Sequence, residues 1–406
     1  SNSGQGRLEL DQKKLHLQHQ SGAPFESKLL GDITLGDVMQ FELALDWRDI
    51  HLPVAENRTV IGKRGSLAVS GPVDALNIKG DGAFIVEPLG DLDLILNASW
   101  KDTALTLQAL QANLLEGQLD LTGQLDLEEN TRGRFQLEGQ SLNFGVIDSD
   151  LNSRIKLSST LELDSDEQGL SSRLMISSLS GDWRGFPLKG KADISHGPEA
   201  LRIDRLQLES GNNRIDAKLD MAESLSGFAD LAIADMTVFS SELAGSINGR
   251  VNIGGKLETP KLEGNIRGKD IYINEVRLAS LTGKATIDLR PQQHSSLDVE
   301  IDTLRYRNQQ FDTVLIKGNG LTESHQLLVD AIASELKIRT QLSGGLKQPQ
   351  WSGLIEQLEI NSTSFGSWAL NNSVVASYRF DNQAYKLNEL CLSENNAGFC
   401  VVSTRE

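Results

Sequence analysis

Aromatic side chains are scarce in this sequence. They make up 5% of its 406 residues, although a globular β-sandwich of this length relies on aromatic volume to fill its core. Any interior would therefore consist mainly of Leu, Ile and Val. Helical periodicity is also rare, and the best candidate, residues 326–336, has flanks that alternate like strands. These two shortages exclude a core covered by long helices.

Positive charge is in the minority. The chain has 39 Lys and Arg residues against 56 Asp and Glu, a formal net charge of −17. Nucleic-acid binders present basic stripes, so we expect no nucleic-acid partner. No apolar run approaches the ~18 residues that a membrane-spanning helix needs, and no signal peptide opens the sequence. Residues 1–3 look like a cloning remnant, so we interpret the sequence as a segment of a longer protein.

Residues that would carry catalysis or bind a metal ion are scattered. His16 and His19 are three residues apart on a predicted strand end, which is a poor metal-binding geometry. The acidic run 164–167 lacks the spaced ligands and glycine of a calcium loop. No nucleophile elbow or phosphate-binding glycine loop is present, and the carboxylates fall mostly on the polar positions of strands. We therefore expect no enzyme activity, no metal and no cofactor.

The only two cysteines are Cys391 and Cys400. A metal site would need further Cys or His nearby, and the closest histidine in sequence, His325, is distant. A local disulfide fits better and implies an oxidising compartment. The alternative is a pair of unbonded, half-buried thiols.

The dominant pattern is alternation of apolar and polar residues with a period of two, which is typical of strands with one apolar face. Gly, Asn, Asp and Ser clusters interrupt it every ~8–14 residues, as turns do. Short helical turns are compatible with residues 27–36, 109–116 and 235–245. The residues that we expect to line the apolar face are Phe41, Leu43, Leu45, Leu92, Leu94, Leu96, Leu119, Leu121, Leu201, Ile203, Ile215, Leu219, Val251, Ile253, Leu262, Ile271, Ile273, Leu297, Val299, Ile301, Ile338, Leu342, Leu358 and Ile360.

A repeated unit occurs near residues 65–80, 249–264 and 338–353. Each copy has an alternating strand followed by two glycines nine residues apart, with apolar residues between them. Two copies share a proline, Pro260 and Pro349, where a strand donor is not required. The repeat predicts a recurring unit of strand, bend and strand.

A sheet with one apolar face must bury that face against a second layer. A sandwich, a closed β-helix and one long sheet folded lengthwise all satisfy this requirement. Separate sandwiches would need linkers, which the sequence lacks, and the irregular strand spacing disfavours a short-period solenoid. The folded sheet is left with an elongated aliphatic slot, and such a slot is a liability in water unless something apolar occupies it. Acyl chains are the obvious occupant.

Residues 181–402 carry a family resemblance. The segments that carry it are Phe186-Pro187-Leu188-Lys189-Gly190, Leu201-x-Ile203-x-x-Leu206-x-Leu208, Gly249-x-Val251-x-Ile253-x-Gly255 and Trp351-x-Gly353-x-Ile355-x-x-Leu358-x-Ile360. Together with the cysteine pair, they resemble the TamB proteins, which are AsmA-like proteins of the Gram-negative envelope.

The resemblance implies a β-taco, a long U-shaped sheet with a hydrophobic interior, continuous over residues 1–406. It implies a periplasmic segment of an inner-membrane-anchored protein that moves phospholipids to the outer membrane through a groove holding their acyl chains. It also implies a link to autotransporter assembly and a partner, the outer-membrane barrel protein TamA, contacted outside this segment. Two alternatives remain open: a structural or adhesin-type β-solenoid with a dry core, and a periplasmic chaperone that holds unfolded strands at an open edge.

Overall fold

The computed structural model describes residues 4–22, 26–55, 58–128 and 130–405. Residues 1–3, which we interpreted as a cloning remnant, lie outside this range. Over the described residues the chain forms 28 strands and three short 3-10 turns. It divides into two compact units, residues 1–211 and 212–406. No helix in the described part of the chain is long and apolar enough to cross a membrane.

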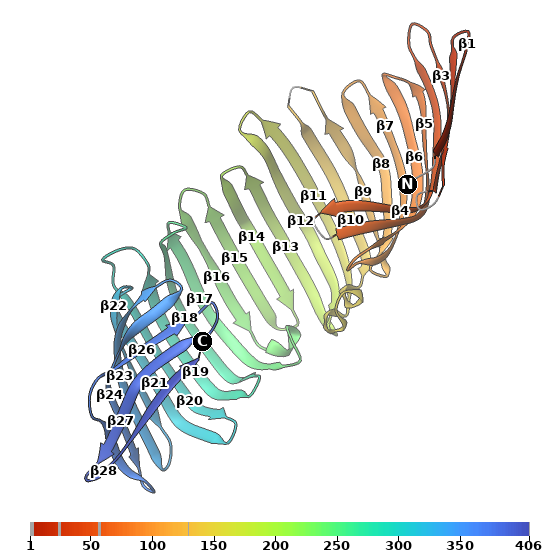
Figure 1. Cartoon of the computed structure of the whole chain (residues 1–406). Coiled ribbons are helices and arrows are strands. Elements are labelled where there is room, and N and C mark those ends of the chain that lie inside the picture. The colour runs from red at the N-terminus through yellow and green to blue at the C-terminus, as the bar shows by residue number, and fades with distance from the viewer. Residues whose placement is uncertain (1–3, 23–25, 56–57, 129, 406) are drawn as a thin grey trace. The chain divides into compact units, whose positions relative to one another are not determined.

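In the first unit each strand pairs antiparallel with the next, so that the sheet is a meander (Figure 1). Two 3-10 turns, η1 (Phe144–Val146) and η2 (Ser149–Leu151), interrupt it. The strands are β1 (Gly4–Asp11), β2 (Lys14–Ser21), β3 (Glu26–Thr34), β4 (Gln40–Ala55), β5 (Arg58–Pro72), β6 (Ala75–Val86), β7 (Gly90–Lys101), β8 (Ala104–Leu114), β9 (Gly117–Asp126), β10 (Arg132–Leu142), β11 (Ser153–Asp166), β12 (Gly169–Trp183), β13 (Phe186–Gly197) and β14 (Ala200–Ser210).

The second unit is also an antiparallel meander, with one 3-10 turn, η3 (Met236–Val238). Its last strands depart from the simple order, because β24 pairs with β25 along one half and with β26 along the other. The strands are β15 (Asn213–Met221), β16 (Leu225–Ile233), β17 (Leu243–Gly255), β18 (Pro260–Ile273), β19 (Val276–Asp288), β20 (Ser295–Tyr306), β21 (Gln309–Leu321), β22 (Ser324–Ile332), β23 (Leu336–Lys347), β24 (Gln350–Ser362), β25 (Gly366–Leu370), β26 (Val374–Arg379), β27 (Tyr385–Glu394) and β28 (Ala397–Arg405).

Strand register turns the alternating sequence into one apolar face in each unit. Directly paired residues of antiparallel strands point to the same side of a sheet. One such row in the first unit consists of Leu45, Leu67, Gly80, Leu96 and Leu110. A row in the second unit consists of Val251, Gly264, Ala285, Leu297 and Gly318. The all-β architecture expected from the sequence is confirmed.

Bulges keep the apolar face intact where the alternation breaks. In β14 the register shifts at Asp204, so that Ile203 and Leu206, three residues apart, both belong to the apolar face. The same shift occurs in β24 between Ile355 and Leu358. In these two strands, apolar residues three positions apart therefore mark a bulge and not the start of a helix.

The helical turns expected from the sequence are partly wrong. Residues 27–36 fall mainly in β3 and residues 109–116 fall mainly in β8, which contains a bulge. Of the three expected turns, only the segment 235–245 contains a helical turn, η3. Residues 326–336, whose flanks favoured a strand, are strand over most of their length. In β8 a bulge brings apolar residues to the spacing that a helix would have.

The three sequence repeats are all hairpins, and two of them have the same register. Leu67 pairs with Gly80 and Val251 with Gly264, so the first two copies are equivalent. In the third copy Gly344 pairs directly with Gly353, because β23 continues past Gly344 to Lys347 before the chain turns. The repeat therefore predicts two strands joined by a turn, but it does not predict which residues of the two strands pair.

The longest hairpin, β4–β5, bends sharply. Asp49 has a φ of 54°, and a register shift separates Gly62 from Arg64. Beyond these points the hairpin runs across the direction of the neighbouring strands (Figure 1). At the bend the Trp47 indole occupies the space that a Gly65 side chain would need, and its ring centroid lies 6.3 Å from that of Phe84.

We predict that Gly65→Ala destabilises the chain by ~1–3 kcal/mol, because the new methyl group must displace the Trp47 indole. Gly283→Ala is the matched control, since its nearest neighbour would be Val299 Cγ2 at 3.8 Å. Urea unfolding followed by tryptophan fluorescence measures both variants. Equal midpoints for the two variants would contradict the assigned position of Trp47.

Candidate functional site

The candidate site is the apolar face of the sheet in each unit, which we define as the side that carries the paired rows through Leu45 and through Val251. All of the residues predicted from the sequence for the apolar face lie on it in their own unit. Most are half-buried, whereas Ile271 is only 3% exposed and Leu262 and Ile273 are 38% and 41% exposed. The face therefore offers aliphatic surface that the protein itself covers only in part.

Simple alternation would place Ile271 and Ile273 on the polar face. Asp270, with a φ of 51°, reverses the side to which the following residues point. The Ile271 side chain consequently lies over Gly268, where it occupies the space of the missing side chain. Gly268 belongs to the apolar face through its pairing with Leu281 and Ile247. The backbone reversal at Asp270 is therefore what brings Ile271 to the apolar face, and the alternation of the sequence does not reveal it.

Few side chains of this face are fully buried. Seventeen hydrophobic residues of the described chain are buried, and four of them are alanines. A dry core of a chain this long would bury many more large side chains. Some of the buried residues lie beside short segments described below, whereas most aliphatic side chains of the face are only half-buried.

The first of these segments contains η1 and η2. Asn143 accepts hydrogen bonds from the backbone N–H of Gly145 (2.9 Å) and of Ser153 (3.1 Å). The Ser153 hydroxyl, 2% exposed, accepts from the Phe144 N–H at 2.8 Å. Beside this turn Leu142 and Ile155 are 5% and 4% exposed. Polar contacts thus fix the turn next to two apolar side chains that are buried from solvent.

A related segment in the second unit contains η3. Asp235 caps the turn through the Thr237 N–H (2.9 Å) and hydroxyl (2.7 Å). The buried amide of Asn213 accepts from the N–H groups of Ala234 (2.7 Å) and Asp235 (2.8 Å). Met236 and Val238, which belong to η3 itself, are 7% and 2% exposed.

A helical turn was expected at residues 235–245, where η3 lies, but none was expected at η1 and η2. The shared signal of the two segments is an Asn or Asp cap followed by an apolar residue, a variable residue and valine, at residues 143–146 and 235–238. Asn and Asp favour such caps because their side chains bond the backbone two residues on.

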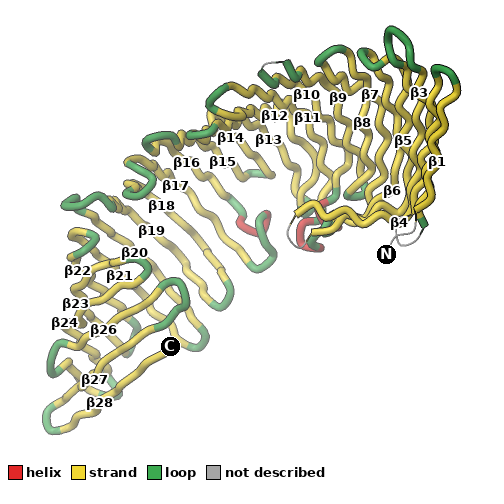
Figure 2. The backbone as a smooth tube through the Cα atoms, turned by 45° about the horizontal axis from the view of Figure 1, so that its top comes forward, coloured by secondary structure: helices red, strands yellow, loops and turns green. Residues whose placement is uncertain are grey.

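The end of the second unit has a small core of its own. Val374, Leu390 and Leu392 are buried there. Figures 1 and 2 show β27 and β28 lying obliquely across earlier strands of the same unit. The side chains packed against this core include two residues assigned to the groove, Leu358 and Ile360. The complete set is Ile355, Leu358, Ile360, Trp368, Leu370 and Leu387.

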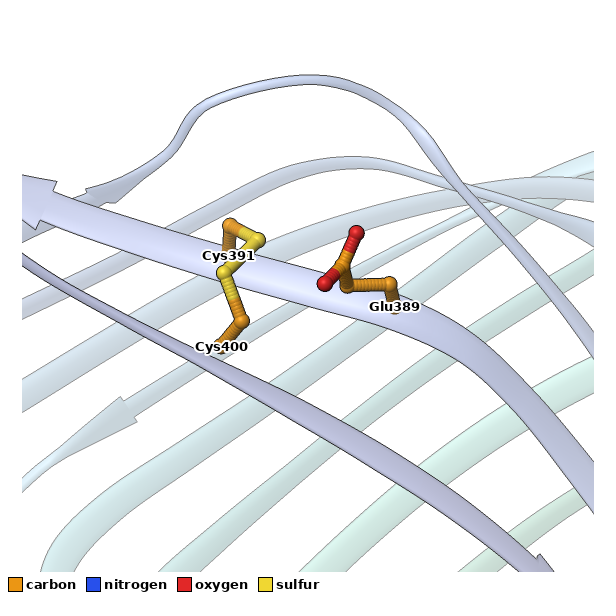
Figure 3. A group of neighbouring side chains, drawn as sticks. All are labelled: Glu389, Cys391 and Cys400. Atoms are coloured by element: carbon orange, nitrogen blue, oxygen red, sulfur yellow. A yellow bond between two sulfur atoms is a disulfide. The ribbon is translucent and has the colours of Figure 1, made fainter.

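Cys391 and Cys400 are directly paired across β27 and β28, and a disulfide joins them (Figure 3). Neighbouring strand residues alternate between faces, so the disulfide lies opposite Leu390 and Leu392. Glu389 and the two sulfurs form the one group of potential metal ligands that lie close together in the described residues. Because the sulfurs are bonded to each other, they offer no thiolate to a metal ion.

The sequence of residues 4–406 matches the family model described as the N-terminal domain of TamB. The chain belongs to the TamB family. It is 23% identical over 303 residues to the translocation and assembly module subunit TamB of Haemophilus influenzae. This alignment covers 72% of the chain but 23% of that relative, so the chain spans less than a quarter of the relative's length.

The polar face of this TamB-family segment carries cross-strand ion pairs. Arg173 donates to both carboxylate oxygens of Asp193, at 2.9 and 2.7 Å, and this contact holds the pKa of Asp193 below its usual range. His16 likewise contacts Asp32, which also pairs with Lys14 at 2.8 Å. Most such pairs are exposed, and exposed pairs contribute little to stability. Their role is to keep this face in water.

One carboxylate differs because it is buried. Asp288 is 3% exposed at the end of β19 and accepts from Arg290 Nε (2.9 Å), Nη2 (2.6 Å) and backbone N–H (3.1 Å). The side-chain hydrogen bonds of Arg290 lower the pKa of Asp288 to about 2. This pair fixes the connection between β19 and β20.

We predict that Asp288 adds an acid-sensitive part to the stability. Its pKa in the folded chain lies below the unfolded value of ~3.9, so the stabilisation is complete above that value and is lost as pH falls towards 2. Asp288→Asn should flatten the decline of the urea midpoint between about pH 4 and 2, and lower the midpoint at pH 7. Asp298→Asn, on the polar face, is the control and should keep the urea midpoint of the unmodified chain at pH 7. Superimposable curves for Asp288→Asn and the unmodified chain would refute this assignment.

We predict that Cys391→Ser with Cys400→Ser lowers the local stability of β27 and β28 by ~2.5 kcal/mol, the chain-entropy value for so short a loop. Amide hydrogen exchange should rise in residues 385–405 and remain unchanged in β15 to β20. A uniform rise over the whole second unit, or no rise, would show that the disulfide does not act locally.

Proposed function

We propose that this segment carries phospholipid acyl chains along its apolar face, as part of a path between the inner and outer membranes of a Gram-negative cell. The observation that supports this most strongly is the incomplete cover. Each unit presents rows of half-buried aliphatic side chains on successive strands, and local segments cover them only at a few places. Exposed apolar surfaces larger than a few hundred Å² are typical of binding sites.

The geometry of a sheet suits a ligand that slides. Successive strands lie ~4.8 Å apart, so the path runs across the strands from row to row. Apolar contacts are non-directional, and a chain moving over Leu, Ile and Val loses little when it advances by one strand. The ligand's headgroup would remain in water beyond the edge of the face. No cofactor is needed for such movement.

We place this path in the periplasm, as part of a longer inner-membrane-anchored protein. An oxidising compartment suits the Cys391–Cys400 disulfide. The matched relative is a subunit of a translocation and assembly module. We propose that this segment serves such a module, with the outer-membrane barrel protein TamA as a partner contacted by parts of the protein outside this sequence.

We predict that Ile253→Glu lowers the phospholipid bound to the purified chain at least about tenfold, since the carboxylate must be desolvated in the acyl path. Leu262→Glu should act in the same way, because Leu262 pairs directly with Ile253. Ile273→Glu tests a third position on this face. The chain is incubated with phosphatidylethanolamine and phosphatidylglycerol vesicles, re-isolated, and its bound lipid is counted by native mass spectrometry.

Asn252→Glu is the matched control, because it places the same charge on the polar face one residue away. It should bind as much lipid as the unmodified chain. Equal lipid on Ile253→Glu and Asn252→Glu would exclude the apolar face as the path. No lipid on any variant or on the unmodified chain would favour a dry structural solenoid or a chaperone.

A further inference from the structure

The apolar face of the second unit contains a distinct hollow of about 200 Å³. It lies between the ends of β19, β20, β21, β22 and the end of β23. The surface exposed inside it is mainly apolar, although six of its thirteen lining residues are polar: Ser295, Ser296, Asn319, Thr322, His325 and Gln326. The aliphatic residues are Ile287, Leu289, Leu297, Leu321, Leu327 and Leu346.

Gly318 is part of the lining of this hollow. It pairs directly with Leu297 on one side and with Leu327 on the other. A Cβ atom at Gly318 would lie 3.0 Å from Leu327 Cδ1 and 3.5 Å from Leu297 Cβ. The two leucines therefore flank a position without a side chain, and a larger residue there would add bulk between them.

Polar contacts hold the hollow in shape. The Asp288 N–H donates to Ser295 Oγ at 2.9 Å, and the Thr322 hydroxyl donates to the Asp288 carbonyl at 3.3 Å. These bonds connect the β19–β20 loop to the β21–β22 turn. The hollow is therefore preformed by the strand ends and does not depend on a ligand.

His325 completes the wall and has both ring nitrogens engaged. The indole N–H of Trp351 can only donate, so His325 Nε2 accepts from it, at 3.0 Å. His325 Nδ1 then donates to the carbonyls of Leu321 and Thr322, each at 3.2 Å. Because both ring nitrogens of His325 are engaged in these hydrogen bonds, this part of the wall presents mainly carbon atoms to a ligand.

We infer that this hollow holds a segment of a single acyl chain and so forms a holding site on the path. The inference rests on the proposed function. A cavity of ~150 Å³ lined by Leu, Ile and Phe stays dry and binds benzene, so a hollow of this size holds several carbons but not a whole lipid. Leu297 belongs both to the hollow and to the continuous face, so a flexible alkyl chain can lie in both. Movement along the second unit is therefore stepwise at this point.

The test uses stearic acid carrying a diazirine near its methyl end, both free and as an acyl chain of phosphatidylethanolamine. The chain is equilibrated with each probe, irradiated and digested, and the labelled residues are mapped by mass spectrometry. Label should concentrate on the lining residues between 287 and 346. Gly318→Leu, which fills the hollow, should lower this label about tenfold, because the alkyl segment loses two or more buried methylene contacts.

Gly283→Leu is the matched control. Gly283 pairs with Val299 and Ile266 on the same face, lies outside the hollow, and has room for a side chain. Leu346→Ala widens the hollow without adding bulk, and it should keep or increase the label. Circular dichroism of each variant checks the sheet.

The possible outcomes distinguish the holding site from the lipid path on which it depends. Label spread evenly over the apolar face, and unchanged in Gly318→Leu, would overturn the holding site and leave the lipid path standing. Loss of label in Leu346→Ala to the same extent as in Gly318→Leu would also overturn it, because widening should not expel the chain. No label on any residue of the apolar face would overturn both.

Discussion

The structure depends on one constraint: the sheet has more aliphatic surface than its own chain covers. Nothing in the described residues supplies a helical layer, so the cover comes from short local devices. The capped turns at residues 143–151 and 235–238 and the core at the end of the second unit are such devices. Between them the aliphatic side chains remain half-buried.

The composition follows from the same constraint. Glycines stand in the rows of the apolar face beside leucines, as Gly80 does beside Leu67 and Leu96. This leaves shallow space on the face where aromatic side chains would fill it. Of the tryptophans, Trp47 lies at the β4–β5 bend and Trp368 packs against the core at the end of the second unit. The opposite face carries exposed ion pairs, which keep the sheet in water without adding much stability.

Much of the fold could be predicted from the sequence, because alternation and register are local properties. Leu92, Leu94 and Leu96 lie on one face simply because the period of a strand is two. Bulges were harder to predict, since the spacing from Ile203 to Leu206 is equally compatible with a helix until strand pairing is known. The role of Leu358 and Ile360 in a local core could not be predicted, because it depends on strands that return from further along the chain. The hollow needs the Trp351–His325 hydrogen bond, which joins strands far apart in sequence.

The central claim is that lipid, and not protein, completes the cover of the apolar face. A photo-crosslinking amino acid placed at Val299 and at its neighbours Asp298 and Glu300 tests it most directly, since adjacent strand residues point to opposite faces. After incubation of the purified chain with phospholipid vesicles, the account predicts lipid adducts at Val299 and none at Asp298 or Glu300. Adducts in equal amount at all three positions, or at none of them, would contradict it.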